Sequence, residues 1–503
     1  MRKIPATMAT QHPDNALPPF WDKQKDPFIS VYKELDEAVI SLKELGAAEF
    51  MWDWEGKHAD AAVIDKLFSE HYEYFSKHQL NRDKFLTFRL PNIWEEKGYS
   101  LLQAMTVILT AEDFARDLGF ENRPLFEVIL PMTENADQLM KMHLLFEKLA
   151  NFKSKEFTAG NPDNRNTIEL IPLVESVQSQ QSIGRLLKEY SAKFQKHYGK
   201  KPKYIRPFLA CSDPALMSGK LATILTNKVA LSQIYQFSRD SGIPVYPISG
   251  PGSLVFRGGL SPDHVHEYIR EYPGVRTATV QSGFRFDNAK AKVQKAIALL
   301  DKELPKTTPV IFDHETAKKL IRISNASEKV YQETLSAIVS DLQGIFNAVP
   351  KRRERRQHIG LLAYGRKVGA QKMPRAITFT CGFYSLGVPP EFIGLGRILK
   401  TIKDDELKVL NDTYGSLKDD LKRAGRYLNA QNLDTLASRN PAWRQVQKDV
   451  ELAQEALQLE LGPKTSSEKK HLELTSQILN LGQNRTKLSK KIVEAAIHRQ
   501  SLG

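Results

Sequence analysis

Cysteine is almost absent from this chain of 503 residues, whose two cysteines, Cys211 and Cys381, are far apart and lack CxxC spacing. This scarcity argues against a disulfide-stapled scaffold and against a structural zinc site. No apolar run approaches the ~20 residues that a membrane span requires, and the first residues lack the apolar core of a signal peptide. We therefore expect a cytoplasmic protein with no membrane partner.

Internal repeats and low-complexity linkers are also missing, so nothing suggests a solenoid or a string of separate modules. Hydrophobic residues make up 41% of the chain and charged residues 26%, which is typical of a globular protein with a sizeable core.

The net charge is strongly positive, at +13. Such a balance suits either nucleic-acid binding or a site for a small polyanion. The basic run at residues 351–356 is not accompanied by a zinc finger, an RNP signature or aromatic residues interleaved with the basic ones. We expect no nucleic-acid partner, and a solvated helix face is the alternative reading of the run.

Short β-rich runs alternate with helical patterns through the first half of the chain. The runs lie at residues 85–88, 126–130, 168–171, 204–209, 244–248 and 277–280. Strands that alternate with helices indicate parallel βαβ units. Because polar residues gather just after these runs, as they do at the catalytic face of a barrel, the pattern favours a TIM-like (β/α)8 barrel over an open sheet.

Apolar residues recur at helical spacing in the second half, over residues 318–349 and 404–499. One segment, residues 375–383, has the character of a strand. We therefore predict one domain spanning residues 1–503. Its barrel would occupy mainly residues 1–300 plus the strand near 375–383, and residues 300–503 would supply many additional C-terminal helices.

Two carboxylates follow predicted strands and should reach the same barrel mouth. Glu175 and Asp213 would suit Mg²⁺ or Mn²⁺, which prefer oxygen ligands and keep several waters. The alternatives are helix N-capping by Asp213 and a structural salt bridge by Glu175. Glu134, in a similar sequence context, is placed in the preceding barrel unit and is not assigned to the metal.

Arginines and glycines form a second group of candidates. Arg257 is followed by Gly258 and Gly259, which would let backbone and guanidinium approach an anion together. Arg366, Arg375 and Arg89 could supply further positive charge. Taken singly, the RGG segment could be a plain turn, and each of the other arginines could be a surface residue.

His12 stands before a proline in Thr10-Gln11-His12-Pro13, and proline disfavours helical backbone at the residue before it. The imidazole is therefore expected on a loop, where it could transfer a proton, although a surface or capping histidine is the alternative.

Five motifs, taken in order, resemble the phosphoenolpyruvate carboxylase family. They are Thr10-Gln11-His12-Pro13, Ile171-Pro172-Leu173-Val174-Glu175-Ser176, Cys211-Ser212-Asp213-Pro214, Arg257-Gly258-Gly259-Leu260-Ser261-Pro262 and Pro374-Arg375-Ala376-Ile377-Thr378. The chain length and the segment Met51-Trp52-Asp53-Trp54-Glu55-Gly56-Lys57 look like the short, archaeal-type branch. The first arginine of the family's glycine-rich loop has no counterpart, since Pro251 or its neighbours stand there, and Lys220 is shifted from the family's lysine position.

The resemblance implies a carboxy-lyase that makes oxaloacetate and phosphate from phosphoenolpyruvate and bicarbonate, with Mg²⁺ or Mn²⁺ as cofactor. It assigns the metal to Glu175 and Asp213 and catalysis to His12, Arg257 and Arg375. Substrate binding would fall to Arg89, Arg366, Gly258 and Gly259, in a homotetramer. A metal-dependent aldolase acting on a pyruvate-type substrate, on the same barrel, is the alternative enzyme.

Overall fold

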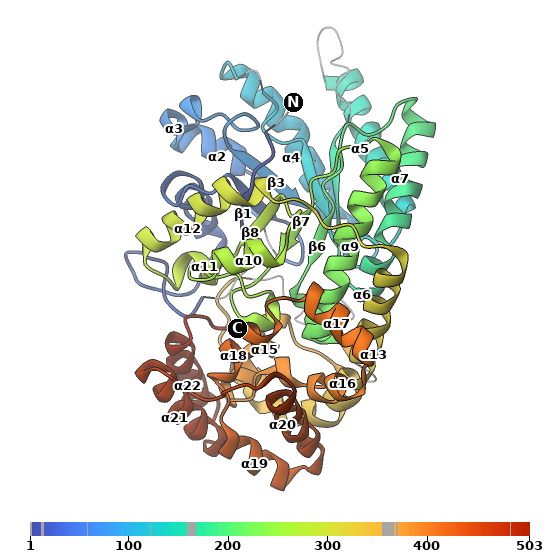
Figure 1. Cartoon of the computed structure of the whole chain (residues 1–503). Helices are drawn as coiled ribbons and strands as arrows, with labels where there is room; N and C mark the ends of the chain where they lie inside the picture. Colours follow the sequence, from blue (N-terminus) through green and yellow to red (C-terminus); the bar gives the residue numbers. More distant parts are fainter. Residues whose placement is uncertain are drawn as a thin grey trace.

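The computed structural model describes residues 3–11, 15–57, 59–120, 122–157, 167–354, 367–368, 371–482 and 484–503. Eight parallel strands close into a barrel in chain order, which confirms the predicted fold class (Figure 1). The strands are β1 (Thr7–Thr10), β2 (Glu49–Asp53), β3 (Phe85–Arg89), β4 (Glu127–Leu130), β5 (Glu169–Val174), β6 (Phe208–Ala210), β7 (Ile248–Gly250) and β8 (Thr277–Val280).

Helices between the strands, together with two helices after β8, surround this barrel. They are α1 (Glu34–Val39), α2 (Val63–Glu70), α3 (Tyr72–Lys77), α4 (Gly98–Asp117), α5 (Ala136–Phe157), α6 (Val177–Gln181), α7 (Ile183–Tyr198), α8 (Ser212–Ser218), α9 (Lys220–Ser241), α10 (Val265–Glu271), α11 (Ser282–Phe286) and α12 (Lys290–Glu303). No helix in the described ranges is both long and apolar enough to cross a bilayer.

The barrel interior is filled in layers by alternate side chains of the strands. An apolar plug occupies the middle and comprises Met8, Met51, Ile129, Ile171, Leu173, Phe208 and Ile248. Residues on the opposite faces of the same strands, such as Phe50 and Trp52, join the larger core between strands and helices. Because side chains alternate along a strand, residues two positions beyond the plug reach the barrel mouth.

The C-terminal part of the chain is a layer of helices at one end of the barrel (Figure 1). It contains α13 (His314–Ile338), α14 (Gln343–Ala348), α15 (Ala376–Ser385), α16 (Leu395–Thr401), α17 (Asp404–Thr413), α18 (Leu417–Gly425), α19 (Ala430–Arg439), α20 (Arg444–Leu457), α21 (Ser466–Asn480) and α22 (Arg485–His498). Helix α15 contacts α8 and the short 3-10 helix η3 (Val255–Arg257), which follow β6 and β7. The layer therefore packs on the carboxyl ends of the strands.

The strand predicted at residues 375–383 is wrong, because this segment forms helix α15. A short, continuous apolar run does not distinguish a buried strand from a buried helix. Phe379 and Phe383 pack against Phe256 and Trp443, and a Cβ on Gly382 would collide with the Phe346 ring. Close packing against other helices therefore decides the conformation. An antiparallel pair, β9 (Lys367–Val368) and β10 (Gln371–Lys372), precedes it.

The barrel floor is a buried ionic network centred on Arg206. Its Nη2 donates to Glu49 Oε2 at 2.7 Å and its Nη1 donates to Glu127 Oε2 at 2.5 Å. The Thr277 hydroxyl accepts a further bond from Nη2 at 3.1 Å. All three charged side chains are buried, so each depends on the others for compensation of its lost hydration.

Arg206→Met should therefore destabilise the protein by roughly 3–5 kcal/mol, because two buried carboxylates would lose their cation. Urea unfolding at neutral pH would measure the loss. Adding Glu49→Gln and Glu127→Gln should recover much of it. A single variant as stable as the parent would contradict this role for the network.

Candidate active site

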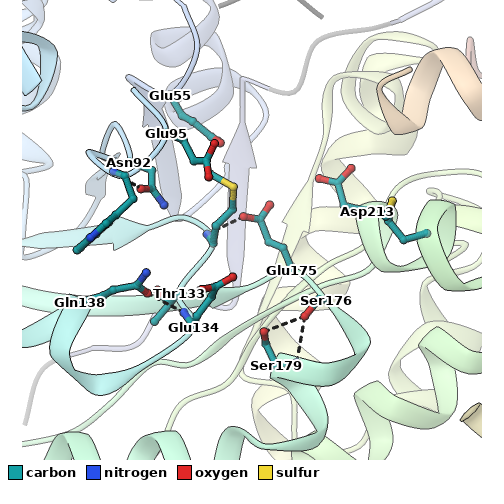
Figure 2. A pocket seen from close by; sticks show the side chains of 13 residues that line it. Glu55, Asn92, Glu95, Thr133, Glu134, Gln138, Glu175, Ser176, Ser179 and Asp213 are labelled. Atoms are coloured by element: carbon teal, nitrogen blue, oxygen red, sulfur yellow. Dashed lines mark hydrogen bonds between the residues drawn. The ribbon is translucent and has the colours of Figure 1, made fainter. Parts of the chain in front are cut away.

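A cavity of about 320 Å³ opens at the carboxyl ends of strands β2 to β6 (Figure 2). Parallel strands of a barrel direct the loops that follow them to one face, where barrel enzymes place their chemistry. The lining residues are Glu55, Asn92, Trp94, Glu95, Met132, Thr133, Glu134, Gln138, Glu175, Ser176, Ser179, Asp213 and Met217.

Glu175 and Asp213 meet in this cavity, as the sequence predicts. Glu175 directly follows β5, and Asp213 lies in the first turn of α8. Figure 2 shows the two carboxylates facing the same open space from different elements. The N-cap of α8 is Cys211, so Asp213 is not the capping residue that the alternative reading requires.

The turn after β4 fixes one oxygen of Glu175. The Met132 N–H donates to Glu175 Oε2 at 2.7 Å. Met132 has φ 50°, in the left-handed region that side-chain-bearing residues seldom adopt. Such outliers persist where surrounding structure enforces them, often at functional sites. The left-handed backbone at Met132 thus directs its N–H toward the Glu175 carboxylate and orients that side chain in the cavity.

The donor set of the cavity fits a hard divalent cation. Within the described ranges, no group of three or more histidine, cysteine or acidic side chains is arranged to hold a metal. Mg²⁺ in particular is usually bound by one or two carboxylates, with waters and substrate oxygens completing the shell. Glu175 and Asp213 meet that requirement through their chemistry and their shared cavity.

Arg89 lies at the end of β3 and is buried, with carboxylates on both sides of its guanidinium. Its Nε and Nη2 donate to Asp53 at 2.8 and 2.7 Å, and its Nη1 lies 2.7 Å from Glu55 Oε2. Burial opposes the charge of Arg89, but the attraction of Asp53 and Glu55 outweighs it and raises the pKa well above its ordinary value. The ion pairs connect Arg89 to Glu55, which lines the cavity. Direct substrate binding by Arg89 stays a prediction.

The RGG segment forms a closed loop around a buried arginine. Arg257 Nε donates to Ser212 Oγ at 3.1 Å and its Nη2 donates to Gln281 Oε1 at 2.5 Å, while Nη1 donates to a main-chain oxygen of Gly503. Ser212 immediately precedes Asp213, so the loop and the carboxylate helix are linked.

The two glycines of this loop are required by its backbone. Gly258 has φ 123° and Gly259 has φ 74°, both unfavourable for other residues. A Cβ on Gly258 would lie 2.7 Å from Pro251 Cβ, and one on Gly259 would lie 2.7 Å from Arg423 Nη2. The segment is therefore tightly packed and is more than an exposed turn.

The remaining predicted residues fall into two groups. Arg375 is the half-buried N-cap residue of α15, whose helix contacts α8 and η3, the elements of Asp213 and Arg257. His12 and Arg366 lie outside the described residues.

Several cavity residues were missed from sequence. Glu55, Asn92 and Glu95 all follow β2 or β3 and line the cavity. Glu55 could have been found from the alternation of aromatic and acidic residues in Met51-Trp52-Asp53-Trp54-Glu55, had that run been recognised as a strand. Glu134 also lines the cavity, but its side chain is exposed.

Comparison with known proteins shows the family. A family model described as phosphoenolpyruvate carboxylase matches residues 4–503. A protein of that name from Leuconostoc mesenteroides is 52% identical over 95% of this chain and 94% of its own. Another from Oenococcus oeni is 50% identical over 100% and 99%, and one from the archaeon Metallosphaera sedula is 35% identical over 100% of both.

The chain belongs to the phosphoenolpyruvate carboxylase family. The alignment with the archaeal relative covers the whole of both chains, so this chain is a member of the short, archaeal-type branch. Bacterial relatives also belong to this branch. The predictions of an enzyme and of a carboxy-lyase class are confirmed.

Two side chains after β8 anchor the chain on both sides of residues 12–14. Arg285 Nη2 donates to the Thr10 carbonyl at 2.5 Å. Asp287 accepts from the Ala16 N–H at 3.0 Å and the Leu17 N–H at 2.7 Å. Burial raises the pKa of Asp287 to about 7, although these N–H bonds and the charges of Arg352 and Arg499 act to lower it.

This shift predicts a pH-dependent contribution to stability. The folded pKa of Asp287 lies above its ordinary value of 3.8, so the folded state binds this proton more tightly. The resulting stabilisation is complete below pH 3.8 and is lost as pH rises through about 7. Asp287→Asn removes this titration, so the parent should lose stability relative to the variant between about pH 5 and pH 8.

Thermal midpoints of the parent and of Asp287→Asn, measured at both pH values, test this expectation. Asp412→Asn, at an exposed aspartate, is the control. A pH-independent difference for Asp287→Asn would disprove the assignment.

Proposed function

We propose that this chain carboxylates phosphoenolpyruvate with bicarbonate, giving oxaloacetate and phosphate, with Mg²⁺ or Mn²⁺ held by Glu175 and Asp213. The observation that carries the proposal is the meeting of these two carboxylates in one cavity at the barrel mouth, in a chain of the carboxylase family. A divalent cation at this pair would supply Lewis-acid stabilisation of the phosphate and enolate oxygens.

The first chemical step would be attack of a bicarbonate oxygen on the phosphorus, which breaks the bond to the enol oxygen. The products are carboxyphosphate and the enolate of pyruvate. Arg257 and Arg375 would stabilise the charge that spreads over the transferring phosphoryl group, with Arg366 and Arg89 as further substrate-binding arginines. Gly258 and Gly259 would let the loop backbone approach the anion.

The second step needs a base and a dry site. His12 would take the proton of carboxyphosphate, which then splits into CO₂ and phosphate beside the enolate. The enolate carbon attacks CO₂ to form oxaloacetate. Exclusion of water matters here because water would protonate the enolate to pyruvate.

The alternatives have less support. A pyruvate-type aldolase would also use two metal-binding carboxylates, but the family match extends over residues 4–503. Nucleic-acid binding rests on net charge alone, and the charged residues that line the cavity are all acidic. The cytoplasmic location and the homotetramer stay predictions.

Removal of either metal carboxylate should abolish activity by weakening cation binding. Glu175→Gln and Asp213→Asn each replace a charged oxygen ligand with a neutral amide. We expect Mn²⁺ affinity and the rate of oxaloacetate formation to fall together by at least roughly 100-fold, where each tenfold change in affinity corresponds to about 1.4 kcal/mol. Electron paramagnetic resonance measures Mn²⁺ binding, and a malate dehydrogenase-coupled assay measures oxaloacetate. Glu134→Gln, at an exposed position in the same cavity, should keep Mn²⁺ affinity. Normal Mn²⁺ binding by both ligand variants would reject the metal assignment.

His12→Asn should separate the two steps. Phosphate would still be released in a bicarbonate-dependent reaction, but carboxyphosphate would hydrolyse and the enolate would leave as pyruvate. The ratio of phosphate to oxaloacetate, which is one for a coupled enzyme, should rise several-fold. Arg257→Lys is the contrast, because loss of the planar fork should slow phosphate release itself. A His12→Asn enzyme with a ratio of one and the parental rate would leave the mechanism without its base.

A further inference from the structure

Strand β1 brings a threonine hydroxyl to the barrel mouth. Met8 belongs to the apolar plug inside the barrel, so Thr10, two residues further on, faces the axis above that plug. Its side chain is fully buried, at 0% exposure. Thr10 Oγ1 nevertheless has no hydrogen-bond partner among the described residues.

The next residue presents a second unsatisfied polar group. Gln11 is also fully buried, and its Oε1 accepts the Asp53 N–H at 2.8 Å. That bond identifies the oxygen end of the amide, so Nε2 is the end directed away from the Asp53 backbone. Gln11 Nε2 has no partner in the part of the chain that the structure describes.

The surroundings hold both residues in place. Arg285 Nη2 donates to the Thr10 carbonyl at 2.5 Å. Asp53, whose N–H orients the Gln11 amide, is itself fixed by two bonds from Arg89 at 2.8 and 2.7 Å. These bonds hold the Thr10 carbonyl and the Gln11 amide oxygen in place at the end of the strand.

A buried polar group without a partner is costly, because burial removes its bonds to water without replacement. Two of them in succession, at the carboxyl end of a barrel strand, lie on the face where barrel enzymes bind substrate. Adjacent unsatisfied groups there fit an oxygen-rich ligand that arrives during the reaction.

We propose that Thr10 Oγ1 and Gln11 Nε2 bind and position bicarbonate, an inference that rests on the carboxylase function proposed above. Bicarbonate offers oxygen acceptors to the Gln11 amide and to the threonine hydroxyl, and the hydroxyl oxygen can in turn accept a hydrogen bond from the O–H of bicarbonate. Both protein groups are neutral hydrogen-bonding groups and carry no charge to offset that of a polyanion. A small monoanion suits this side of the mouth better than the multiply charged phosphate.

The strand order supports this division of the mouth. β1 neighbours β8, and Gln281 directly after β8 holds Arg257. Glu175 and Asp213 follow β5 and β6, further round the barrel. Bicarbonate on β1 would thus lie on the side of the mouth nearer to Gln281 and Arg257, and across the barrel from Glu175.

Gln11→Glu is the decisive variant, because it keeps the acceptor for the Asp53 N–H but replaces the Nε2 donor with a negatively charged oxygen. We expect the KM for bicarbonate to rise at least roughly tenfold, equivalent to about 1.4 kcal/mol, while the KM for phosphoenolpyruvate changes less than about twofold. Thr10→Val, nearly isosteric, should also raise the KM for bicarbonate, and Thr10→Ser should restore it.

A purely structural role gives a different result. If Gln11 only braces β2, Gln11→Glu should leave both KM values unchanged, whereas Gln11→Met should lower the thermal midpoint. The proposal would be overturned if the KM for bicarbonate were unchanged in both Gln11→Glu and Thr10→Val, as it would be if water alone fills the site. An equal rise in the KM values for bicarbonate and phosphoenolpyruvate would also overturn it. Should Gln11→Glu not fold, the pair Thr10→Val and Thr10→Ser decides. Failure of the proposed function is distinct: the parent enzyme would then make no oxaloacetate in a bicarbonate-dependent reaction.

Discussion

Side chains alternate between the inside and the outside of the barrel along each of its eight short strands. This alternation decides which residues fill the single closed interior, and the rest of the structure depends on it. Going up the strands, the interior passes from the ionic floor at Arg206, through the apolar plug, to the polar mouth that holds Thr10, Asp53 and Arg89. A slip of one residue in any strand would exchange its interior and exterior faces. The buried ion pairs of the floor and the mouth would then lose their partners, so register and active-site geometry are secured together.

The C-terminal helices extend this arrangement beyond the barrel. Phe379 of α15 stacks on Phe256 of η3, with ring centroids 5.6 Å apart, so the loop of Arg257 is held from above. Arg423 of α18 fills the space beside Gly259. Loops at a barrel mouth are ordinarily its most mobile parts. Here helices of the C-terminal layer pack on the arginine loop, which the barrel part of the chain carries together with Glu175 and Asp213.

The sequence was sufficient for the barrel, for the meeting of Glu175 and Asp213, and for the family. It was insufficient for β1 and β2, whose four and five residues carry polar side chains that serve the floor and the mouth and so obscure the strand pattern. It was misleading for α15, whose helical form depends on contacts with distant aromatic residues such as Trp443. The pairing of Arg89 with Asp53 and Glu55 was also out of reach, because strand register decides which charges meet.

The left-handed backbone at Met132 limits which residues can replace Met132 during evolution. The useful group is the peptide N–H that contacts Glu175, which every residue except proline possesses. Selection would therefore act on conformation more than on the thioether. Glycine and asparagine, which tolerate positive φ, should be accepted as replacements, whereas valine and isoleucine should be excluded. A position that looks chemically indifferent across relatives can in this way carry a strict requirement on shape.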